Sequence, residues 1–164
     1  MENQSAIEQW MIFVWPLSTG RMLPSHVLVP LDGSPLADEA LQHALAAFDC
    51  RVTVLNIVTP LDAGMSEGGI LEPDESRQAD ARERADQLIK TAKAEAAAAD
   101  RSVETTVETG DPASAIVDYA EQHTVDHIVM GGHGGERGEL ARRLLGTVAT
   151  AVLGEAPVTV TVVR

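Results

Sequence analysis

The residues best suited to chemistry lie in one glycine-rich stretch, GGHGGERGELARRLLGT, which runs from Gly131 to Thr147. Five of its first eight residues are glycines, and the apolar run HIVM precedes them. Glycines let a ligand approach the backbone closely, and a cluster of them after a strand can direct several N–H groups at one point. An anion is the natural ligand of such a cluster. A flexible turn that holds nothing is the alternative interpretation.

A second feature that favours anions closes the stretch. Gly146 and Thr147 precede VATAVLGEA, in which Val148, Ala151 and Val152 recur at helical spacing. Thr147 can therefore cap a helix whose N-terminus also attracts phosphate. The loop and the start of the helix could then hold different phosphates of one ligand.

Two common phosphate-binding motifs do not fit this stretch. A Walker A loop requires a lysine, and the chain has none after Lys93. The Rossmann dinucleotide fingerprint follows the first strand of its fold, whereas these glycines follow the fourth expected strand and have a different spacing. We therefore do not expect the hydrolysis chemistry of P-loop proteins.

Apolar runs that alternate with helical patterns predict a single α/β domain with a parallel sheet. The expected strands are residues 26–31, 52–58, 103–108, 127–130 and 158–163. Ser34 and Asp111, each followed by proline, mark two helix starts. Another helix is expected over about residues 76–99, after a long loop over 59–74. The polar alternation of VETTVE indicates an edge strand.

Right-handed crossovers favour a doubly wound, Rossmann-like or flavodoxin-like sheet in a three-layer sandwich, of order 2-1-3-4-5 or 3-2-1-4-5. Such sheets bind ligands beyond the carboxyl ends of their strands. In the second order the loop at Asp32, after the first strand, faces the loop at Gly131. Asp32 could accept hydrogen bonds from ribose hydroxyls, or could form only an Asx-turn within DGS.

Composition excludes several classes of partner. With 25 acidic and 12 basic residues the formal net charge is −13, so we expect no binding to nucleic acid or anionic membranes. Lysine is scarce and alanine abundant, which is typical of halophilic proteins, although an ordinary acidic protein is the alternative. No apolar run is long enough to span a membrane, and a cytoplasmic location is expected. The five histidines lack metal-site spacing, and Cys50 is expected to be a small core residue at a helix end.

Residues 1–24 differ from the rest of the chain. They hold three of its five aromatic residues but no basic n-region, so they make a poor signal peptide. We expect a disordered extension or translation that starts at Met22, with a docking peptide as the alternative. The domain itself is expected over residues 25–164.

The runs VLVPLDGSPLADEALQHAL, GDP, IVMGGHGG, LLGTVATAVL and APVTVTVVR occur in this order over residues 25–164. In types and order they resemble the universal stress protein family. The resemblance implies strand order 3-2-1-4-5 and a homodimer through the last strand, residues 158–163. Arg164 is the only charge near that strand, so pairing with a second copy would cover its edge.

One branch of that family binds ATP and is marked by G-x2-G-x9-G-[ST]. Gly131, Gly134, Gly146 and Thr147 resemble this motif, but eleven residues separate Gly134 from Gly146, and ten separate Gly135 from it. The longer loop could bulge outward and leave its anchor points in place, or it could displace the N–H groups that hold phosphate.

The resemblance implies a site for ATP, with or without Mg²⁺, that is formed by residues from several parts of the chain. The implied residues are Pro30, Leu31, Asp32, Ile57, Val58, Met130, Gly131, His133, Gly134, Gly135, Arg137, Gly146, Thr147 and Val148. Asp32 would contact the adenosine, and the backbone of Ile57 or Val58 would read the adenine edge. Met130 would pack against the nucleoside, and His133 would be a donor in the loop that lines the phosphates.

The charged residues of the loop would have opposite effects on phosphate binding. Glu136 and Glu139 add like charge near the implied phosphates, and Arg137, Arg142 or Arg143 could offset them. Alternatively, these arginines pair with the glutamates at the surface.

Three classes of function follow from these patterns. The favoured one is an ATP-binding sensor or regulator of the stress response, with at most slow hydrolysis. The second is a dimeric interaction module of the same fold that binds no nucleotide and whose long loop contacts a regulatory protein partner. A small-molecule enzyme is the third, and no catalytic constellation in the sequence supports it.

Overall fold

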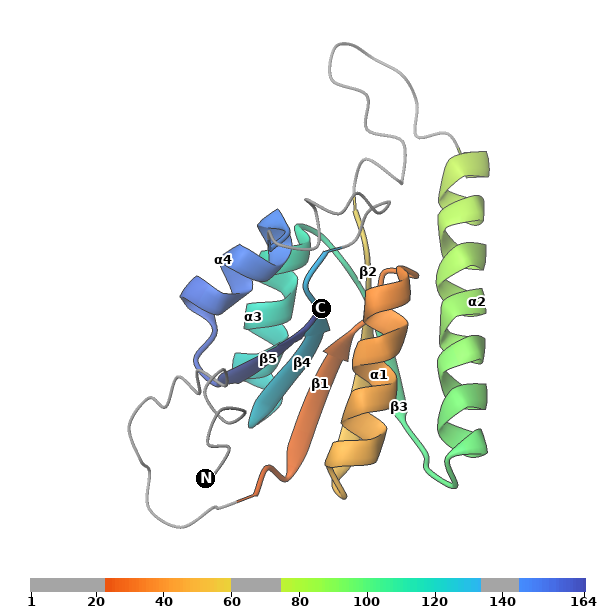
Figure 1. Cartoon of the computed structure of the whole chain (residues 1–164). Coiled ribbons are helices and arrows are strands. Elements are labelled where there is room, and N and C mark those ends of the chain that lie inside the picture. The colour runs from red at the N-terminus through yellow and green to blue at the C-terminus, as the bar shows by residue number, and fades with distance from the viewer. Residues whose placement is uncertain (1–22, 60–74, 134–144) are drawn as a thin grey trace, which may run out of the picture.

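The structure, a computed structural model, describes residues 23–59, 75–133 and 145–164. Five parallel strands form one sheet of order β3-β2-β1-β4-β5, with helices on both faces (Figure 1). The strands are β1 (His26–Pro30), β2 (Arg51–Val58), β3 (Glu104–Thr109), β4 (His127–Gly131) and β5 (Thr159–Val163). The helices are α1 (Pro35–Ala47), α2 (Glu75–Ala98), α3 (Pro112–Gln122) and α4 (Thr147–Glu155). The three-layer α/β class and the order 3-2-1-4-5 are confirmed, and β3 lies at an edge as its polar pattern predicts.

The central strand β1 is buried on both faces, which explains its unbroken run of valine and leucine. Val27, Leu28 and Val29 are all 0% exposed. Successive side chains alternate, so Val27 and Val29 join the core beneath α1 and α2, whereas Leu28 joins the core beneath α3 and α4. The sheet therefore separates two hydrophobic cores.

The helix starts follow the sequence in two cases and differ in one. Ser34 and Asp111 each accept a hydrogen bond from the backbone N–H three residues further on, at 3.3 and 3.0 Å. At α4 the N-cap is Gly146, which offers no side-chain cap. The expectation that Thr147 caps this helix is wrong, because Thr147 is already its first helical residue. The first N–H groups of α4 therefore have no side-chain acceptor at the N-cap.

At the end of the sheet where β2 begins, Arg101 connects the end of α1 to the start of β2 through hydrogen bonds. Its guanidinium donates to the carbonyls of Leu45, Phe48 and Cys50, at 2.8, 2.8 and 2.9 Å. The carbonyl of Leu45 lies in the last turn of α1 and those of Phe48 and Cys50 follow the helix, so none of them has an intrahelical partner. Cys50 is half-buried and packs against the core beneath α1, as expected for a small residue after a helix.

Parts of the expected organisation lie outside the described residues. These are residues 1–22 of the N-terminal extension and residues 60–74 of the long loop. Among the helices that are described, none is both long enough and apolar enough to cross a membrane.

His26, at the start of β1, is a buried histidine whose uncharged form the fold favours. It is 2% exposed, its Nδ1 donates to the carbonyl of His123 at 3.1 Å, and its Nε2 accepts from the hydroxyl of Thr53 at 2.8 Å. Burial first, and then the charge of Arg51, lower the pKa of His26 below its usual 6.5. Folding therefore favours the uncharged imidazole.

The stabilising contribution of His26 should be complete above pH 6.5 and be lost as the pH falls toward its lower folded-state pKa, because the unfolded chain binds the proton more readily. The variant His26→Asn should be less stable at about pH 7.5 but lose less of its free energy of unfolding between about pH 7.5 and 5.5. Urea denaturation at several pH values measures this. Parallel pH profiles for the two proteins would contradict the assignment.

Candidate functional site

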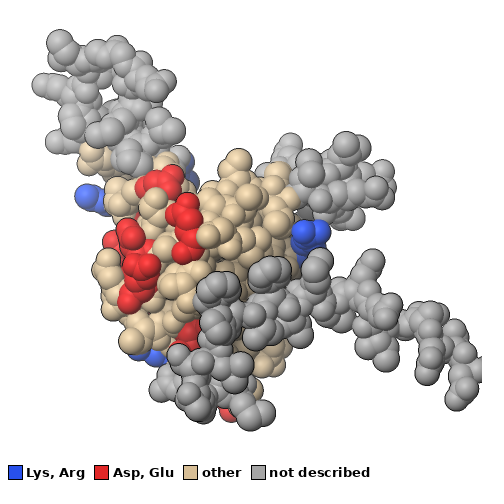
Figure 2. All heavy atoms as spheres, turned by 90° about the vertical axis from the view of Figure 1, so that its left-hand side faces the viewer, with Lys and Arg blue, Asp and Glu red and all other residues tan. Residues whose placement is uncertain are grey.

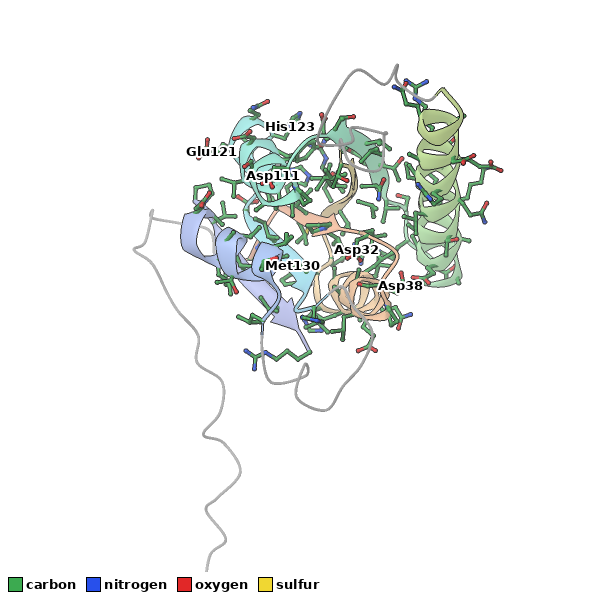
Figure 3. The ribbon with its side chains drawn as sticks, turned by 90° about the horizontal axis from the view of Figure 1, so that it is seen from above. Asp32, Asp38, Asp111, Glu121, His123 and Met130 are labelled. Carbon is green, nitrogen blue, oxygen red and sulfur yellow. The ribbon has the colours of Figure 1, made fainter. Side chains whose placement is uncertain are left out.

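A cavity of about 660 Å³ lies over the carboxyl ends of β1, β2 and β4. This is the place where the winding of the sheet reverses, because β2 and β3 lie on one side of β1 and β4 and β5 on the other. Viewed from above, Asp32 and Met130 lie near the middle of this end of the molecule, between α2 and α4 (Figure 3). The cavity therefore occupies the position that the doubly wound fold predicts.

The structure brings together every sequence-predicted site residue that it describes. Those that line the cavity are Pro30, Leu31, Asp32, Ile57, Val58, Met130, Gly131, His133, Gly146, Thr147 and Val148. The remaining three, Gly134, Gly135 and Arg137, lie outside the described residues.

Asp32 forms the Asx-turn that the sequence allowed, and it does so with one of its two carboxylate oxygens. Its Oδ1 accepts the N–H of Ser34 at 2.9 Å, so the Asx-turn is present. Its other carboxylate oxygen has no hydrogen-bond partner within the described segments. Asp32 is exposed and lines the cavity. Burial first, and then the charge of Asp32, raise the pKa of Asp38 one turn into α1.

At the end of β2 the backbone of Ile57, and not that of Val58, is turned toward β1. The N–H and C=O of one strand residue point to the same neighbouring strand, and successive residues alternate. The carbonyl of Val58 accepts from Gly110 at 3.1 Å, on the β3 side, whereas the carbonyl of Leu55 accepts from Leu31 at 2.9 Å, on the β1 side. Ile57 follows Leu55 by two residues and lies beyond the last pair of the β1–β2 ladder. Its polar groups therefore face the cavity with no backbone partner among the described residues.

Gly131 is required by packing. A Cβ at this position would lie 2.8 Å from the carbonyl carbon of Leu36 and 2.9 Å from the nitrogen of Ala37, both in the first turn of α1. Backbone atoms cannot move aside as a flexible side chain would. The glycine thus lets α1 begin directly against the end of β4.

Gly132 ties together three elements at the rim of the cavity. Its N–H donates to the carbonyl of Val163 at the end of β5, at 2.8 Å, and its carbonyl accepts from the N–H of Gly146 at 2.7 Å. The two ends of the glycine-rich stretch are therefore in direct contact. Gly132 was not predicted as a site residue, although the repeated glycine was a signal for it.

The start of α4 and His133 together form a place for an anion. The N–H groups of Thr147 and Val148 belong to the first turn, where a helix has no partners of its own. Nδ1 of His133 is buried and has no hydrogen-bond partner among the described residues. This ring nitrogen lies 3.5 Å from where a Cβ of Gly146 would stand. A helix N-terminus beside a histidine nitrogen suits phosphate.

Sequence reasoning missed the helical walls of the cavity. The additional lining residues include Ala81, Arg84, Ala85 and Leu88 from α2, and Pro112 and Ile116 from α3. Within the described lining, Asp32 is the acidic side chain and Arg84 is the arginine. In residues 23–59, 75–133 and 145–164 no three histidine, cysteine or acidic side chains group to hold a metal ion.

The fold and the cavity define a doubly wound protein with a ligand site at its switch point. More specifically, the family model of the universal stress proteins matches residues 24–164, and the chain belongs to this family. It is 31% identical over 153 residues to universal stress protein MJ0531 of Methanocaldococcus jannaschii, across 90% of this chain and 86% of that protein. The structure of universal stress protein UspA from Lactobacillus plantarum is 26% identical, with a TM-score of 0.74 over 88% of this chain and 100% of that one.

Two more distant structures share the fold. A universal stress protein in complex with cAMP is 23% identical, with a TM-score of 0.62 over 86% of this chain and 97% of that one. A family member from Arabidopsis thaliana with AMP bound is 17% identical, with a TM-score of 0.60 over 85% of this chain and 91% of that one.

The variant Gly131→Ala should be less stable by about 1–3 kcal/mol, because its methyl group would overlap the backbone of α1. Gly154→Ala is the matched control, since nothing lies within 4 Å of a Cβ there. That control should match the wild type or exceed its free energy of unfolding by up to about 1 kcal/mol. Urea denaturation measures both. Equal stability of the two variants would show that α1 does not need the glycine.

Proposed function

We propose that the protein binds an adenine nucleotide, with ATP as the expected ligand, and acts as a nucleotide-dependent sensor or regulator of the stress response. The observation that carries this proposal is the convergence on one cavity of a carboxylate, an open strand backbone and an uncapped helix start. A cavity of this size is in the usual range for small-molecule ligands. The fold relatives that contain cAMP and AMP support an adenine nucleotide as the ligand class.

The nucleoside would be held at the ends of β1 and β2. Adenine presents a donor, its 6-amino group, beside an acceptor, N1, and this pair complements the C=O and N–H of one strand residue. Ile57 offers both groups on the β1 side. Guanine presents the opposite pattern at these two positions, so Ile57 would select adenine. The unpartnered carboxylate oxygen of Asp32 would accept from the ribose hydroxyls.

The phosphates would lie at the start of α4. In the part of the chain that the structure describes, the donors there are the N–H groups of Thr147 and Val148 and the Nδ1 of His133. The contact between Gly132 and Gly146 keeps the two ends of the long loop together, which favours a loop that bulges outward from fixed anchor points. Roles for Gly134, Gly135 and Arg137 at the phosphates, and for Mg²⁺, stay predictions.

Protein purified in concentrated KCl should carry ATP or ADP, or take up added Mg-ATP in preference to Mg-GTP. Ion-exchange chromatography of the denatured sample and isothermal titration calorimetry measure this. The variant Gly146→Val should lose affinity at least about tenfold, because its side chain would crowd the carbonyl of Gly132, 3.3 Å from the Cβ position, where the loop ends meet.

Gly154→Val, at an open position on the same helix, is the control and should bind as the wild type does. A wild-type protein that neither carries nor takes up nucleotide in the same salt would remove the nucleotide site. It would favour the interaction module as the function of this fold.

We also propose that two copies pair through β5. This strand forms an edge of the sheet, and the described segment 145–164 carries only Glu155 and Arg164 as charged residues. In Figure 2 uncharged atoms cover the middle of the face on the α4 side, and acidic side chains gather to one side of it. Leu153 is 44% exposed on α4. A chain with a net charge of −13 can approach a second copy most easily through such an uncharged surface.

The variant Val160→Pro should convert a dimer into a monomer. The carbonyl of Val163 accepts a hydrogen bond on the β4 side, so by alternation Val160 directs its N–H outward, where proline removes it without breaking the β4–β5 ladder. Val107→Pro makes the same change at the outer edge of β3 and is the control. Multi-angle light scattering measures the masses. A monomeric wild type across micromolar concentrations, or a dimeric Val160→Pro, would refute pairing through β5.

A further inference from the structure

Helix α2 forms a wall of the cavity at the end opposite the glycine-rich stretch. Its lining residues are Ala81, Arg84, Ala85 and Leu88. The helix packs on β2, whereas α4 and the glycines belong to the β4 side, with β1 in between. Two strand spacings, roughly 10 Å, therefore separate the α2 end of the cavity from its phosphate-suited end. Figure 3 shows α2 and α4 on opposite sides of Asp32 and Met130.

Arg84 lies one turn of α2 beyond the contact between this helix and the β1–α1 turn. Leu88 makes that contact, since its Cδ2 lies 3.1 Å from where a Cβ of Gly33 would stand. Arg84 precedes Leu88 by four residues and so lies on the same face. Helical side chains lean toward the N-terminus, which directs the guanidinium away from the sheet and toward the mouth of the cavity.

The charge of Arg84 is available to a ligand. Two other arginines of the described chain serve the fold, because Arg51 pairs with Glu104 and Arg101 donates to three carbonyls. Arg84 is exposed, and no hydrogen bond or ion pair joins it to another residue in the described ranges. Among the described residues that line the cavity, Arg84 is the one whose side chain carries a permanent positive charge.

The small side chains beside Arg84 leave room for a flat ring. Ala81 and Ala85 are 5% and 4% exposed and line the cavity on either side of it along the helix. An adenine whose edge meets the backbone of Ile57 on the β1 side would lie above the end of β1, beside the β1–α1 turn that α2 contacts through Leu88. A guanidinium at that place meets the face of a base, and arginine binds such faces through its charge and its planar shape.

We propose that α2 supplies the base-binding wall of the nucleotide site and that the guanidinium of Arg84 packs on the face of the adenine ring. This inference rests on the proposed function and extends it. It assigns Arg84 to the base. The usual expectation for a positive side chain in a nucleotide site is a contact with the phosphates.

The affinities for ATP, ADP, AMP and adenosine separate these two roles. Arg84→Ala should weaken the binding of all four ligands by a similar factor, roughly three- to tenfold. Arg84→Lys should restore only part of that loss, because lysine keeps the charge but lacks the planar group. Arg82→Ala is the matched control, an exposed arginine of the same helix that does not line the cavity, and should leave the affinities unchanged. Isothermal titration calorimetry gives the dissociation constants.

A loss for Arg84→Ala that grows with the number of phosphates and vanishes for adenosine would overturn the placement at the base. Wild-type affinities for all four ligands in this variant would remove the α2 wall from the site, while the proposed nucleotide binding would stand. A wild-type protein that binds none of the four ligands would overturn the proposed function itself. Arg84 is exposed, so these variants should retain the circular dichroism of the wild type.

Discussion

The way the chain leaves the sheet after β1 determines where everything else at the site lies. Leu31 still donates to Leu55, but its own carbonyl accepts from the side chain of Asn56 at 2.8 Å. This buried amide takes the place of a strand partner and satisfies the last polar group of β1. Gly33, with φ of +82°, then turns the chain into α1. Beyond that point β2 continues without β1 beside it, and the open backbone at Ile57 is the direct result.

The glycines of the stretch from Gly131 to Thr147 meet several separate constraints. Gly131 allows α1 to pack against β4, and Gly132 joins β4, β5 and the start of α4. Gly146 occupies the N-cap of α4 in an extended conformation, and its N–H donates to the carbonyl of Gly132. The three described glycines of the stretch are therefore explained by close packing of the backbone. Among the described residues, the donors left for an anion are the N–H groups of Thr147 and Val148 and the ring of His133.

The fold was predictable because its signals are local. Valine-rich runs mark strands that are buried on both faces, and the capped prolines mark the starts of α1 and α3. Expected and observed boundaries differ by a residue, as for β3, expected over 103–108 and found over Glu104–Thr109. The choice between Ile57 and Val58 could not be made from the sequence. It depends on which neighbouring strand the N–H and C=O of each residue face. The pairing of β2 with β1 and β3 determines this alternation.

The wall formed by α2 was hidden for a related reason. The alanines of α2 recur at helical spacing and predict a helix that packs on the sheet, and Ala92 and Ala96 do so. Ala81 and Ala85 continue the same stripe of alanines beyond the end of β1. There the helix no longer faces a strand, and these two side chains line the cavity. The pattern is the same on both parts of the helix. Only the length of α2 relative to the strands distinguishes core from cavity wall, and that length cannot be read from periodicity.

A site of this kind resolves a difficulty for a protein with a net charge of −13, which repels an anionic ligand at long range. Concentrated salt screens that repulsion, but it also weakens ion pairs between exposed side chains and phosphate. Hydrogen bonds from the first turn of a helix and from a strand act at contact distance and depend less on bulk salt. In the proposed site Arg84 lies at the base, and the described donors for the phosphates are backbone groups and His133. This arrangement suits an acidic protein better than a lysine-rich loop would.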